Sequence, residues 1–136
     1  MNGLQLTADL YACTHASLLT DRSALATYCR EAVAEAGLQA VGEEWFQFPD
    51  TPAGPGGVTG VVLLAESHVA IHTWPEQASV TLDIYVCNFS QDNSAAAETL
   101  IQRLIDLFAP ARLARQQLIR GTPTAIAHMQ RPESSG

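Results

Sequence analysis

Hydrophobic and polar residues along this chain follow two different periods, which predicts a mixture of strands and helices. Strict alternation over residues 4–10 and again over 80–87 is typical of strands with one buried face. Elsewhere, hydrophobic residues recur three and four positions apart, as on one face of a helix. We therefore expect strands over residues 4–10, 38–48, 58–64, 68–73, 80–87 and 113–119, and helices over residues 17–36 and 94–108.

The ends of these helices carry recognisable signals. Ser17 or Asp21 is suited to cap the first helix and Gly37 to end it, while Pro110 ends the second. The Pro- and Gly-rich segment 49–57 is expected to be a loop.

The order of these elements predicts an α+β fold. Strand, helix, three strands, helix and strand suggest a two-layer sandwich in which two helices cover one face of an antiparallel sheet. The strand at 80–87 carries sizeable side chains on its other face as well, namely Thr81, Asp83, Tyr85 and Cys87. We expect a second subunit to cover that face, so that the sheets of a homodimer pack together.

Length and charge narrow the class of protein. A chain of 136 residues is long enough for one domain and too short for two, so we assign residues 1–120 to that domain and residues 121–136 to a poorly ordered tail. No hydrophobic run is long enough to cross a membrane and the N-terminus has no signal-peptide pattern, so the expected location is the cytoplasm. The net charge of −7 argues against nucleic acid as a partner and suits a small cationic molecule.

The chain has no lysine, and all seven of its basic residues are arginines. Pyridoxal phosphate is held by a lysine Schiff base, so an enzyme of this sequence that acts on amino groups needs another electrophile. Cys13, Cys29 and Cys87 are widely spaced and form no CxxC pair, which argues against a disulfide framework and a zinc knuckle. Cys13 and Cys29 are expected to be small buried hydrophobic residues.

The segment around Ser67 gathers a hydroxyl, two imidazoles and, further along, a thiol, from Ser67, His68, His72 and Cys87. Taken singly, each is most simply an ordinary strand residue. Metal binding by the two histidines is disfavoured, because four residues of a strand span about 13 Å, too far to share one zinc ion. We therefore expect no metal.

A third interpretation is covalent self-modification at Ser67. In a tight, strained turn its hydroxyl attacks the carbonyl of Glu66, and elimination of the resulting ester cuts the chain and leaves a pyruvoyl group at position 67. His72 is suited to remove the serine α-proton, since an imidazole titrates near neutrality. The ketone then forms a Schiff base with a substrate amine, and Cys87 protonates the carbanion left by CO₂.

The same region carries a longer motif, which runs Glu66-Ser67-His68, then Ile71-His72-Thr73-Trp74-Pro75-Glu76, then Asp83 and Cys87. In this order and spacing it resembles the prokaryotic S-adenosylmethionine decarboxylases, a family of pyruvoyl enzymes of polyamine synthesis. Upstream, Gly57-Val58-Thr59-Gly60 resembles the family's Gly-Val-Ser-Gly, and Arg120-Gly121 fits more loosely. The resemblance covers roughly residues 4–121.

The resemblance implies a two-layer fold, a homodimer and cleavage into fragments 1–66 and 67–136. It makes Ser67 the pyruvoyl precursor, His72 the processing residue and Cys87 the catalytic proton donor. Thr59 becomes a hydroxyl that assists processing, with threonine in place of the family's serine. No pyridoxal phosphate is implied.

Three departures from the family bear on the substrate pocket rather than on the processing chemistry. Gln77-Ala78-Ser79 replaces an aromatic, glycine-containing stretch, Asn88 replaces a glycine, and the loop at 49–57 is longer. S-adenosylmethionine is the family's usual substrate, and a basic amino acid, ornithine or arginine, stays as the alternative.

The two kinds of substrate need different pockets. The adenine and sulfonium of S-adenosylmethionine suit an aromatic platform, for which the candidates are Trp45, Phe46 and Phe48. A basic amino acid needs a carboxylate facing its distal cation, for which the candidates are Asp9, Glu43, Glu44 and Glu76. A non-catalytic regulatory homologue that never self-cleaves is the remaining alternative, favoured only by the threonine at Thr59.

Overall fold

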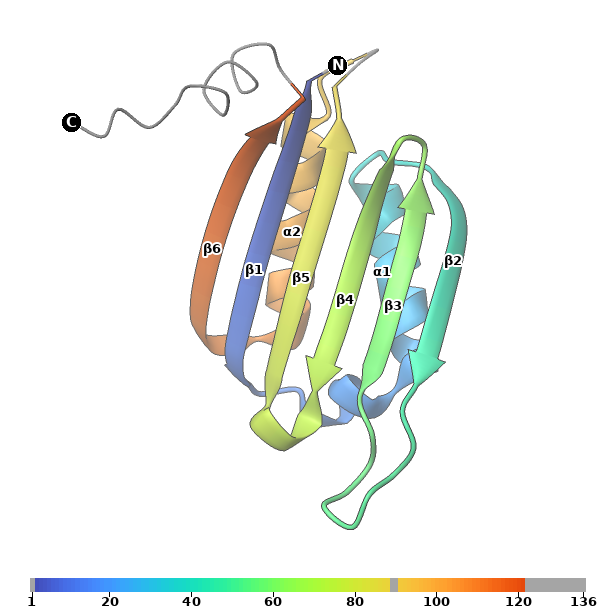
Figure 1. Ribbon diagram of the computed structural model, residues 1–136, viewed down its shortest axis with the longest axis vertical. Helices are drawn as coiled ribbons and strands as arrows, with labels where there is room; N and C mark the ends of the chain where they lie inside the picture. The colour runs from blue at the N-terminus through green and yellow to red at the C-terminus, as the bar shows by residue number, and fades with distance from the viewer. Residues whose placement is uncertain (1, 89–90, 122–136) are drawn as a thin grey trace, which may run out of the picture.

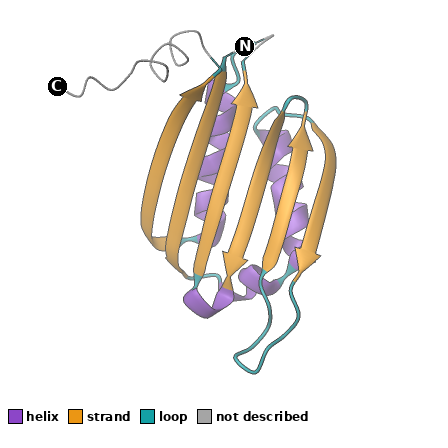
Figure 2. Cartoon of the chain, in the orientation of Figure 1, coloured by secondary structure: helices purple, strands orange, loops and turns teal. Residues whose placement is uncertain are grey.

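The computed structural model describes residues 2–88 and 91–121. One six-stranded antiparallel sheet carries both helices on a single face, which makes two layers (Figure 1; Figure 2). The strands are β1 (Gly3–Cys13), β2 (Ala40–Gln47), β3 (Val58–Leu64), β4 (Ser67–Trp74), β5 (Ser79–Cys87) and β6 (Pro110–Arg120), in the order β2-β3-β4-β5-β1-β6. The helices are α1 (Arg22–Glu35) and α2 (Ser94–Phe108), with short 3-10 helices at Ala16–Thr20 and Pro75–Gln77. The predicted α+β sandwich is confirmed.

The core lies between the sheet and the two helices. Side chains of β5 alternate as predicted, because successive residues of a strand point to opposite faces, and Val80, Leu82, Ile84 and Val86 are buried. The apolar stripe of α2 meets them with Leu100, Ile101, Leu104, Ile105 and Phe108, all buried. We call the other face of the sheet, which no helix covers, the open face.

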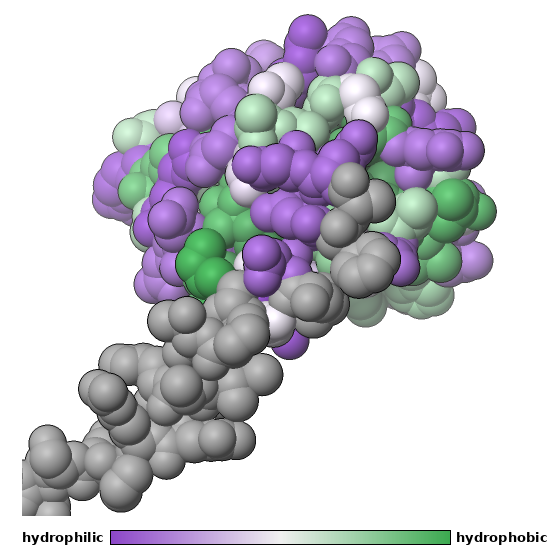
Figure 3. Space-filling model, turned by 90° about the horizontal axis from the view of Figure 1, so that it is seen from above, coloured by the Kyte–Doolittle hydropathy of each residue, from purple (hydrophilic) through white to green (hydrophobic). Residues whose placement is uncertain are grey.

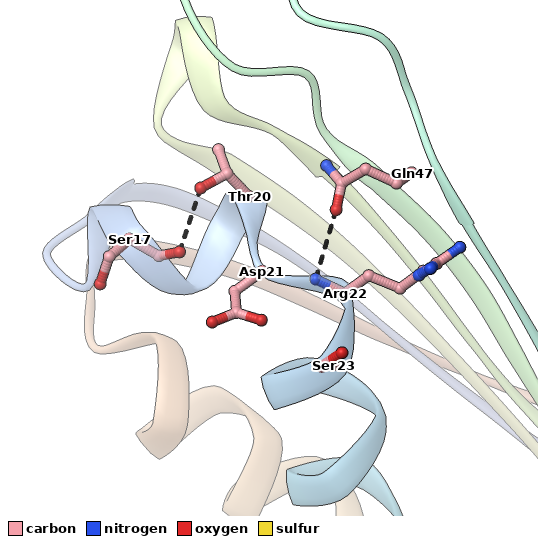
Figure 4. A pocket seen from close by; sticks show the side chains of 6 residues that line it. All are labelled: Ser17, Thr20, Asp21, Arg22, Ser23 and Gln47. Carbon is pink, nitrogen blue, oxygen red and sulfur yellow. Dashed lines mark hydrogen bonds between the residues drawn. The ribbon is translucent and has the colours of Figure 1, made fainter.

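The first helix is shorter than the sequence predicts. Ser17 lies in the 3-10 helix Ala16–Thr20, and α1 begins only at Arg22. Asp21 caps it, since its carboxylate accepts a hydrogen bond from the backbone N–H of Ala24 at 3.0 Å; Figure 4 shows this end of the helix. Gly37 ends the helix with a φ of +81°, as predicted.

The last strand is longer than predicted. β6 begins at Pro110, directly after α2, and runs along β1 to Arg120. It forms one edge of the sheet (Figure 1). The expected tail at 121–136 lies outside the described residues apart from Gly121. Among the described residues, no helix combines the length and apolarity needed to cross a membrane.

Cys13, Cys29 and Cys87 are all free thiols and all buried. Burial first, and then the nearby Glu43 carboxylate, raise the pKa of the Cys29 thiol to about 12. Burial also raises the pKa of Cys13. The expectation that Cys13 and Cys29 are buried hydrophobic residues is confirmed.

The buried thiol of Cys29 predicts a pH-dependent stability. An unfolded thiol ionises near pH 8.5, whereas the folded Cys29 stays neutral until about pH 12. The wild-type free energy of unfolding therefore falls as pH rises through this window, because the unfolded state loses a proton that the folded state keeps. Relative to Cys29→Ala, the wild type should lose about 1–2 kcal/mol between pH 8 and pH 10 in urea denaturation. A difference between the two proteins that stays constant with pH would contradict this.

Candidate active site

The turn between β3 and β4 contains only two residues. Leu64 pairs with Ser67 in the ladder, so Ala65 and Glu66 make the whole connection. Glu66 has a φ of +59°, in the left-handed region that residues with a Cβ rarely adopt. Such a conformation costs on the order of 1–2 kcal/mol. Glu66 and Ser67 thus meet in a tight, strained turn.

Ser67 and Cys87 lie beside each other at one end of the sheet. The β3–β4 turn and the C-terminal end of β5 are at the top of Figure 1, and His68 pairs with Tyr85 one step inside that end. The backbone N–H of Cys87 donates a hydrogen bond to Ser67 Oγ at 3.1 Å. Cys87 is only 7% exposed, whereas Ser67 is partly exposed. Seen from above, this end of the molecule presents hydrophilic and hydrophobic residues side by side (Figure 3).

Asn88 holds the end of β5 in place. Its side-chain oxygen accepts from the backbone N–H of Asn93 at 2.8 Å, and its side-chain nitrogen donates to Ser94 Oγ at 3.1 Å. Its own N–H donates to the carbonyl of Asn2. Asn88, which directly follows Cys87, therefore connects the end of β5 to the start of α2. Nothing in the sequence predicted this role.

Thr59 and His72 form a hydroxyl–imidazole pair on the open face. They are direct cross-strand neighbours on β3 and β4, and Thr59 Oγ1 lies 3.0 Å from His72 Nδ1. Which of the two donates the hydrogen bond depends on the tautomer of the imidazole. The indole of Trp74 lies 6.0 Å from the imidazole, ring centre to ring centre. This pair lies at the bottom of the sheet in Figure 1, where β3 begins and β4 ends.

Within one chain the structure does not bring His72 to Ser67. The two residues are five positions apart on β4, and a strand rises about 3.3 Å per residue, so their Cα atoms are roughly 16 Å apart. Their order along the chain predicts a single group of these residues. The structure divides it into an upper group, Glu66, Ser67 and Cys87, and a lower group, Thr59 and His72, because β4 is extended.

A cavity of about 610 Å³ opens beside the lower group. The loop 49–57 forms one of its walls, and the end of β4 with the following 3-10 helix forms another. The lining residues are Phe48, Pro49, Thr51, Ala53, Gly56, Gly57, Thr59, His72, Thr73, Trp74, Pro75 and Glu76. Its volume is in the range of small-molecule sites, and its lining is mostly apolar with a few polar groups.

The three candidate aromatic residues do not share one face. Phe46 pairs with Thr59 and therefore lies on the open face, where its ring meets that of Phe48 edge-on at 5.0 Å. Trp45 pairs with Gly60 and lies on the helix face, where it packs against the core. A Cβ on Gly60 would come within 2.0 Å of the indole. Trp45 is therefore no longer a candidate for the aromatic platform. The exposed Trp74, which lines the cavity, is a candidate that the sequence did not suggest.

The four candidate acids also separate. Glu43 is on the helix face, where it forms an ion pair with Arg30 at 3.4 Å and accepts a hydrogen bond from the indole of Trp45 at 3.1 Å. Asp9 and Glu44 lie on the open face, opposite Thr81 and Val61 respectively. Glu76 alone lines the cavity.

A polar cluster on the open face was not foreseen from the sequence. The side-chain amide of Gln5 donates to both carboxylate oxygens of Asp83, at 2.9 and 3.0 Å. Arg120 donates to the carbonyl of that amide at 3.1 Å, and its guanidinium lies 5.2 Å from the ring centre of Tyr85. Asp83, Tyr85 and Arg120 were noted from the sequence but their contacts were not, because the partners come from three strands. Within residues 2–88 and 91–121, no group of three or more His, Cys, Asp or Glu side chains is placed to hold a metal ion.

Comparison with known proteins identifies the family. The family model described as S-adenosylmethionine decarboxylase matches residues 4–121. The chain belongs to the S-adenosylmethionine decarboxylase family. A curated relative from Picrophilus torridus, named S-adenosylmethionine decarboxylase proenzyme, is 33% identical over 88% of this chain and 85% of its own length. One of the same name from Archaeoglobus fulgidus is 35% identical over 88% of this chain and 97% of its own.

A solved structure agrees with the family in fold. The crystal structure of the adenosylmethionine decarboxylase from Aquifex aeolicus superimposes with a TM-score of 0.77 at 33% identity and covers 88% of this chain and 91% of that one. These relatives are all named for S-adenosylmethionine, so they do not favour the alternatives of an ornithine or arginine decarboxylase or of a non-catalytic homologue.

The strained residue before the family's serine predicts a measurable stability change. In a Ser67→Ala background, which keeps the chain whole, Glu66→Gly should raise the free energy of unfolding by up to about 1 kcal/mol, because glycine adopts a positive φ freely. The matched control is Ala65→Gly, since Ala65 is in the same turn without a positive φ and should lose stability instead. Urea denaturation measures both variants. Equal losses in the two would show that Glu66 is unstrained.

Proposed function

We propose that this protein is a self-processing, pyruvoyl-dependent S-adenosylmethionine decarboxylase of polyamine biosynthesis. The observation that carries the proposal is the turn at Glu66 and Ser67. A serine directly follows a left-handed residue in a two-residue turn, and its hydroxyl lies against the backbone of a buried cysteine. Membership of the family supports the same activity.

Chain cleavage starts at Ser67. Its hydroxyl oxygen attacks the carbonyl carbon of Glu66, the peptide C–N bond breaks, and an ester joins the two residues while the amine of residue 67 becomes free. Loss of the α-proton then breaks the Cβ–O bond, which releases Glu66 as a carboxylate. Water replaces the nitrogen of the remaining dehydroalanine, ammonia leaves, and residue 67 becomes a pyruvoyl group. The strain at Glu66 favours the first step, since breaking the peptide bond relaxes the turn.

The residues at the upper end fit a pyruvoyl group. It would stand at the N-terminus of β4, and the N–H of Cys87 that now binds Ser67 Oγ would remain there as a hydrogen-bond donor. When formed, the group supplies a ketone that binds the substrate amine and takes up electrons as CO₂ leaves. The thiol of Cys87 is at that end and supplies the proton that replaces CO₂.

Two copies of the chain complete each site. Direct proton transfer needs a base within about 3 Å of the atom that carries the proton, and His72 is roughly 16 Å from Ser67 along the same strand. If two open faces pack about a two-fold axis with their strands running in opposite directions, the upper group of one copy meets the lower group of the other. Thr59 and His72 of one copy then assist cleavage at Ser67 of its partner.

The composition of the open face is consistent with this homodimer. Phe46, Leu63 and Leu118 are on it, at 56%, 49% and 57% exposed. No helix of the described residues covers this face, and burying apolar area of this kind is favourable by roughly 25 cal/mol per Å². The polar cluster around Asp83 is already hydrogen-bonded within one chain, so its burial leaves fewer polar groups unpaired.

The cavity beside the lower group suits the nucleoside end of S-adenosylmethionine. Phe48 and Trp74 offer aromatic surfaces for the adenine and the sulfonium, Phe46 packs against Phe48, and the carboxylate of Glu76 lies at the wall. A small cationic substrate also matches the net charge of −7. We place the enzyme in the cytoplasm, where small-molecule amines are made, without nucleic acid or membrane partners.

Cleavage and decarboxylation can be measured on the same preparations. Electrospray mass spectrometry of the wild type should find fragments 1–66 and 67–136, and the protein should release CO₂ from S-adenosylmethionine. Ser67→Ala should stay whole and inactive. Cys87→Ala should be cleaved but lose turnover about 10²- to 10⁴-fold, as expected for a lost general acid. Two fragments from Ser67→Ala would end the pyruvoyl proposal, and CO₂ released only from ornithine or arginine would change the substrate.

Completion of the site by a second copy predicts complementation. Ser67→Ala lacks the nucleophile and His72→Ala lacks the imidazole, so neither should be cleaved when expressed alone. When both are co-expressed with tags of different mass, about half of the His72→Ala chains should be cleaved, namely those paired with a Ser67→Ala partner. Cleavage confined to the wild type, in samples where native mass spectrometry finds mixed dimers, would place His72 in its own chain's site.

A further inference from the structure

The loop between β2 and β3 is built in two parts. Its tip closes on itself, because the backbones of Thr51 and Gly54 exchange two hydrogen bonds of 2.9 Å each. Its base is closed by the N–H of Phe48, which donates to the carbonyl of Gly57 at 2.9 Å. In Figure 1 the loop extends beyond the lower end of the sheet.

Gly56 and Gly57, the last two residues of this loop before β3, are packed so closely that neither position has space for a Cβ atom. A Cβ on Gly56 would come within 2.2 Å of the carbonyl oxygen of Phe48, and one on Gly57 within 2.3 Å of that of Thr73. Both glycines line the cavity beside Thr59 and His72. The position of the Gly56–Gly57 backbone therefore sets how close this wall comes to the pair.

Gln47 connects that backbone to the helix layer. Its side-chain nitrogen donates to the carbonyls of Gly56 at 2.9 Å and Gly57 at 3.2 Å, and its side-chain oxygen accepts from the backbone N–H of Arg22 at 3.3 Å. Figure 4 shows the last of these contacts, at the start of α1. The side chain of Gln47, the last residue of β2, thus connects the wall of the cavity to the first turn of α1.

Gln47 itself does not face the cavity. It pairs with Val58, whose side chain is 1% exposed in the core, so Gln47 points to the helix face while Phe46, Phe48 and Thr59 are on the other side. It is absent from the cavity lining. Any effect of Gln47 on a ligand must pass through the two carbonyls that it binds.

We propose that Gln47 is a positioning residue that fixes the 48–57 loop as the wall of the substrate cavity, and thereby sets the affinity for the nucleoside end of the substrate. This rests on the proposed function, which assigns that end to this cavity. Without the two donated hydrogen bonds, the Gly57 carbonyl keeps only the bond from the N–H of Phe48, and the Gly56–Gly57 wall is held less firmly against the cavity. The reacting end of the substrate, at Ser67 of the partner copy, is unaffected.

Two substitutions separate the two halves of the Gln47 side chain. Gln47→Ala removes all three hydrogen bonds. Gln47→Glu keeps the acceptor for Arg22 N–H but loses both donors and points a negative oxygen at two carbonyls. The matched control is Gln102→Ala on α2, where an exposed glutamine binds Asp106 on the same helix.

Steady-state kinetics and ligand binding measure the effect. Each variant is tested as the processed enzyme, with CO₂ release from S-adenosylmethionine for kcat and KM. The dissociation constant of 5′-methylthioadenosine, which has the nucleoside and thioether but no carboxylate to lose, is measured by calorimetry. We expect both Gln47 variants to raise KM and this dissociation constant about five- to tenfold, the equivalent of one net hydrogen bond. The value of kcat, the extent of self-cleavage and the behaviour of Gln102→Ala should stay within about twofold of the wild type.

Three outcomes would overturn the proposal while leaving the decarboxylase function intact. The first is an active wild type whose Gln47→Ala variant keeps its KM. The second is a Gln47→Glu variant that binds like the wild type, since the contact with α1 would then be the one that matters. The third is a loss of kcat at unchanged KM. Failure of the proposed function is distinguishable, because the wild type itself would then be uncleaved and inactive.

Discussion

The antiparallel register of β3, β4 and β5 decides where every side chain of the candidate site lies. Pairing of Leu64 with Ser67 leaves two residues for the turn and forces Glu66 into a left-handed conformation. The same register sets Thr59 opposite His72 and leaves Ser67 beside the end of β5, where Cys87 is. A slip of one residue would turn each of these side chains to the other face of the sheet. Burial of Val62, Val69 and Ile71 on the helix face, each at 1% exposed or less, prevents such a slip.

One consequence of this register is that the chemical groups are divided between the two ends of an extended strand. A strand separates residues along its length more than a helix does, about 3.3 Å against 1.5 Å per residue. The five positions from Ser67 to His72 would rise about 7.5 Å along a helix but rise about 16 Å along this strand, which keeps the two side chains apart. In the homodimer that we propose, the open face, with its mixture of aromatic, aliphatic and hydrogen-bonded polar side chains, is the surface through which a second copy supplies the missing group.

The lower end of the sheet has a different physical character from the upper end. At the top, short backbone contacts and a strained turn hold a hydroxyl and a thiol. At the bottom, a loop rich in proline and glycine forms one wall of a cavity, and Gln47 binds two backbone carbonyls of that wall from the far side of the sheet. In the function that we propose, the residue that becomes the pyruvoyl group is at the upper end, and the nucleoside cavity lies at the lower end beside the pair that assists cleavage.

The alternation of hydrophobic residues, the helical spacing and the Gly and Pro positions were enough to predict the strands, both helices and the two-layer architecture, since these depend on local periodicity. The motif from Glu66 to Cys87 was enough to predict the family, whereas the reactive residues that it implies stay a prediction. Asp21, one of the two predicted caps, is the residue that starts the first helix. The helix-facing Trp45 and Glu43 and the contacts of the Asp83 cluster were beyond the sequence, because each depends on which strand lies next to which. The separation of His72 from Ser67 was likewise decided by tertiary structure, since a motif states the order of residues along the chain, whereas proton transfer depends on their distance in space.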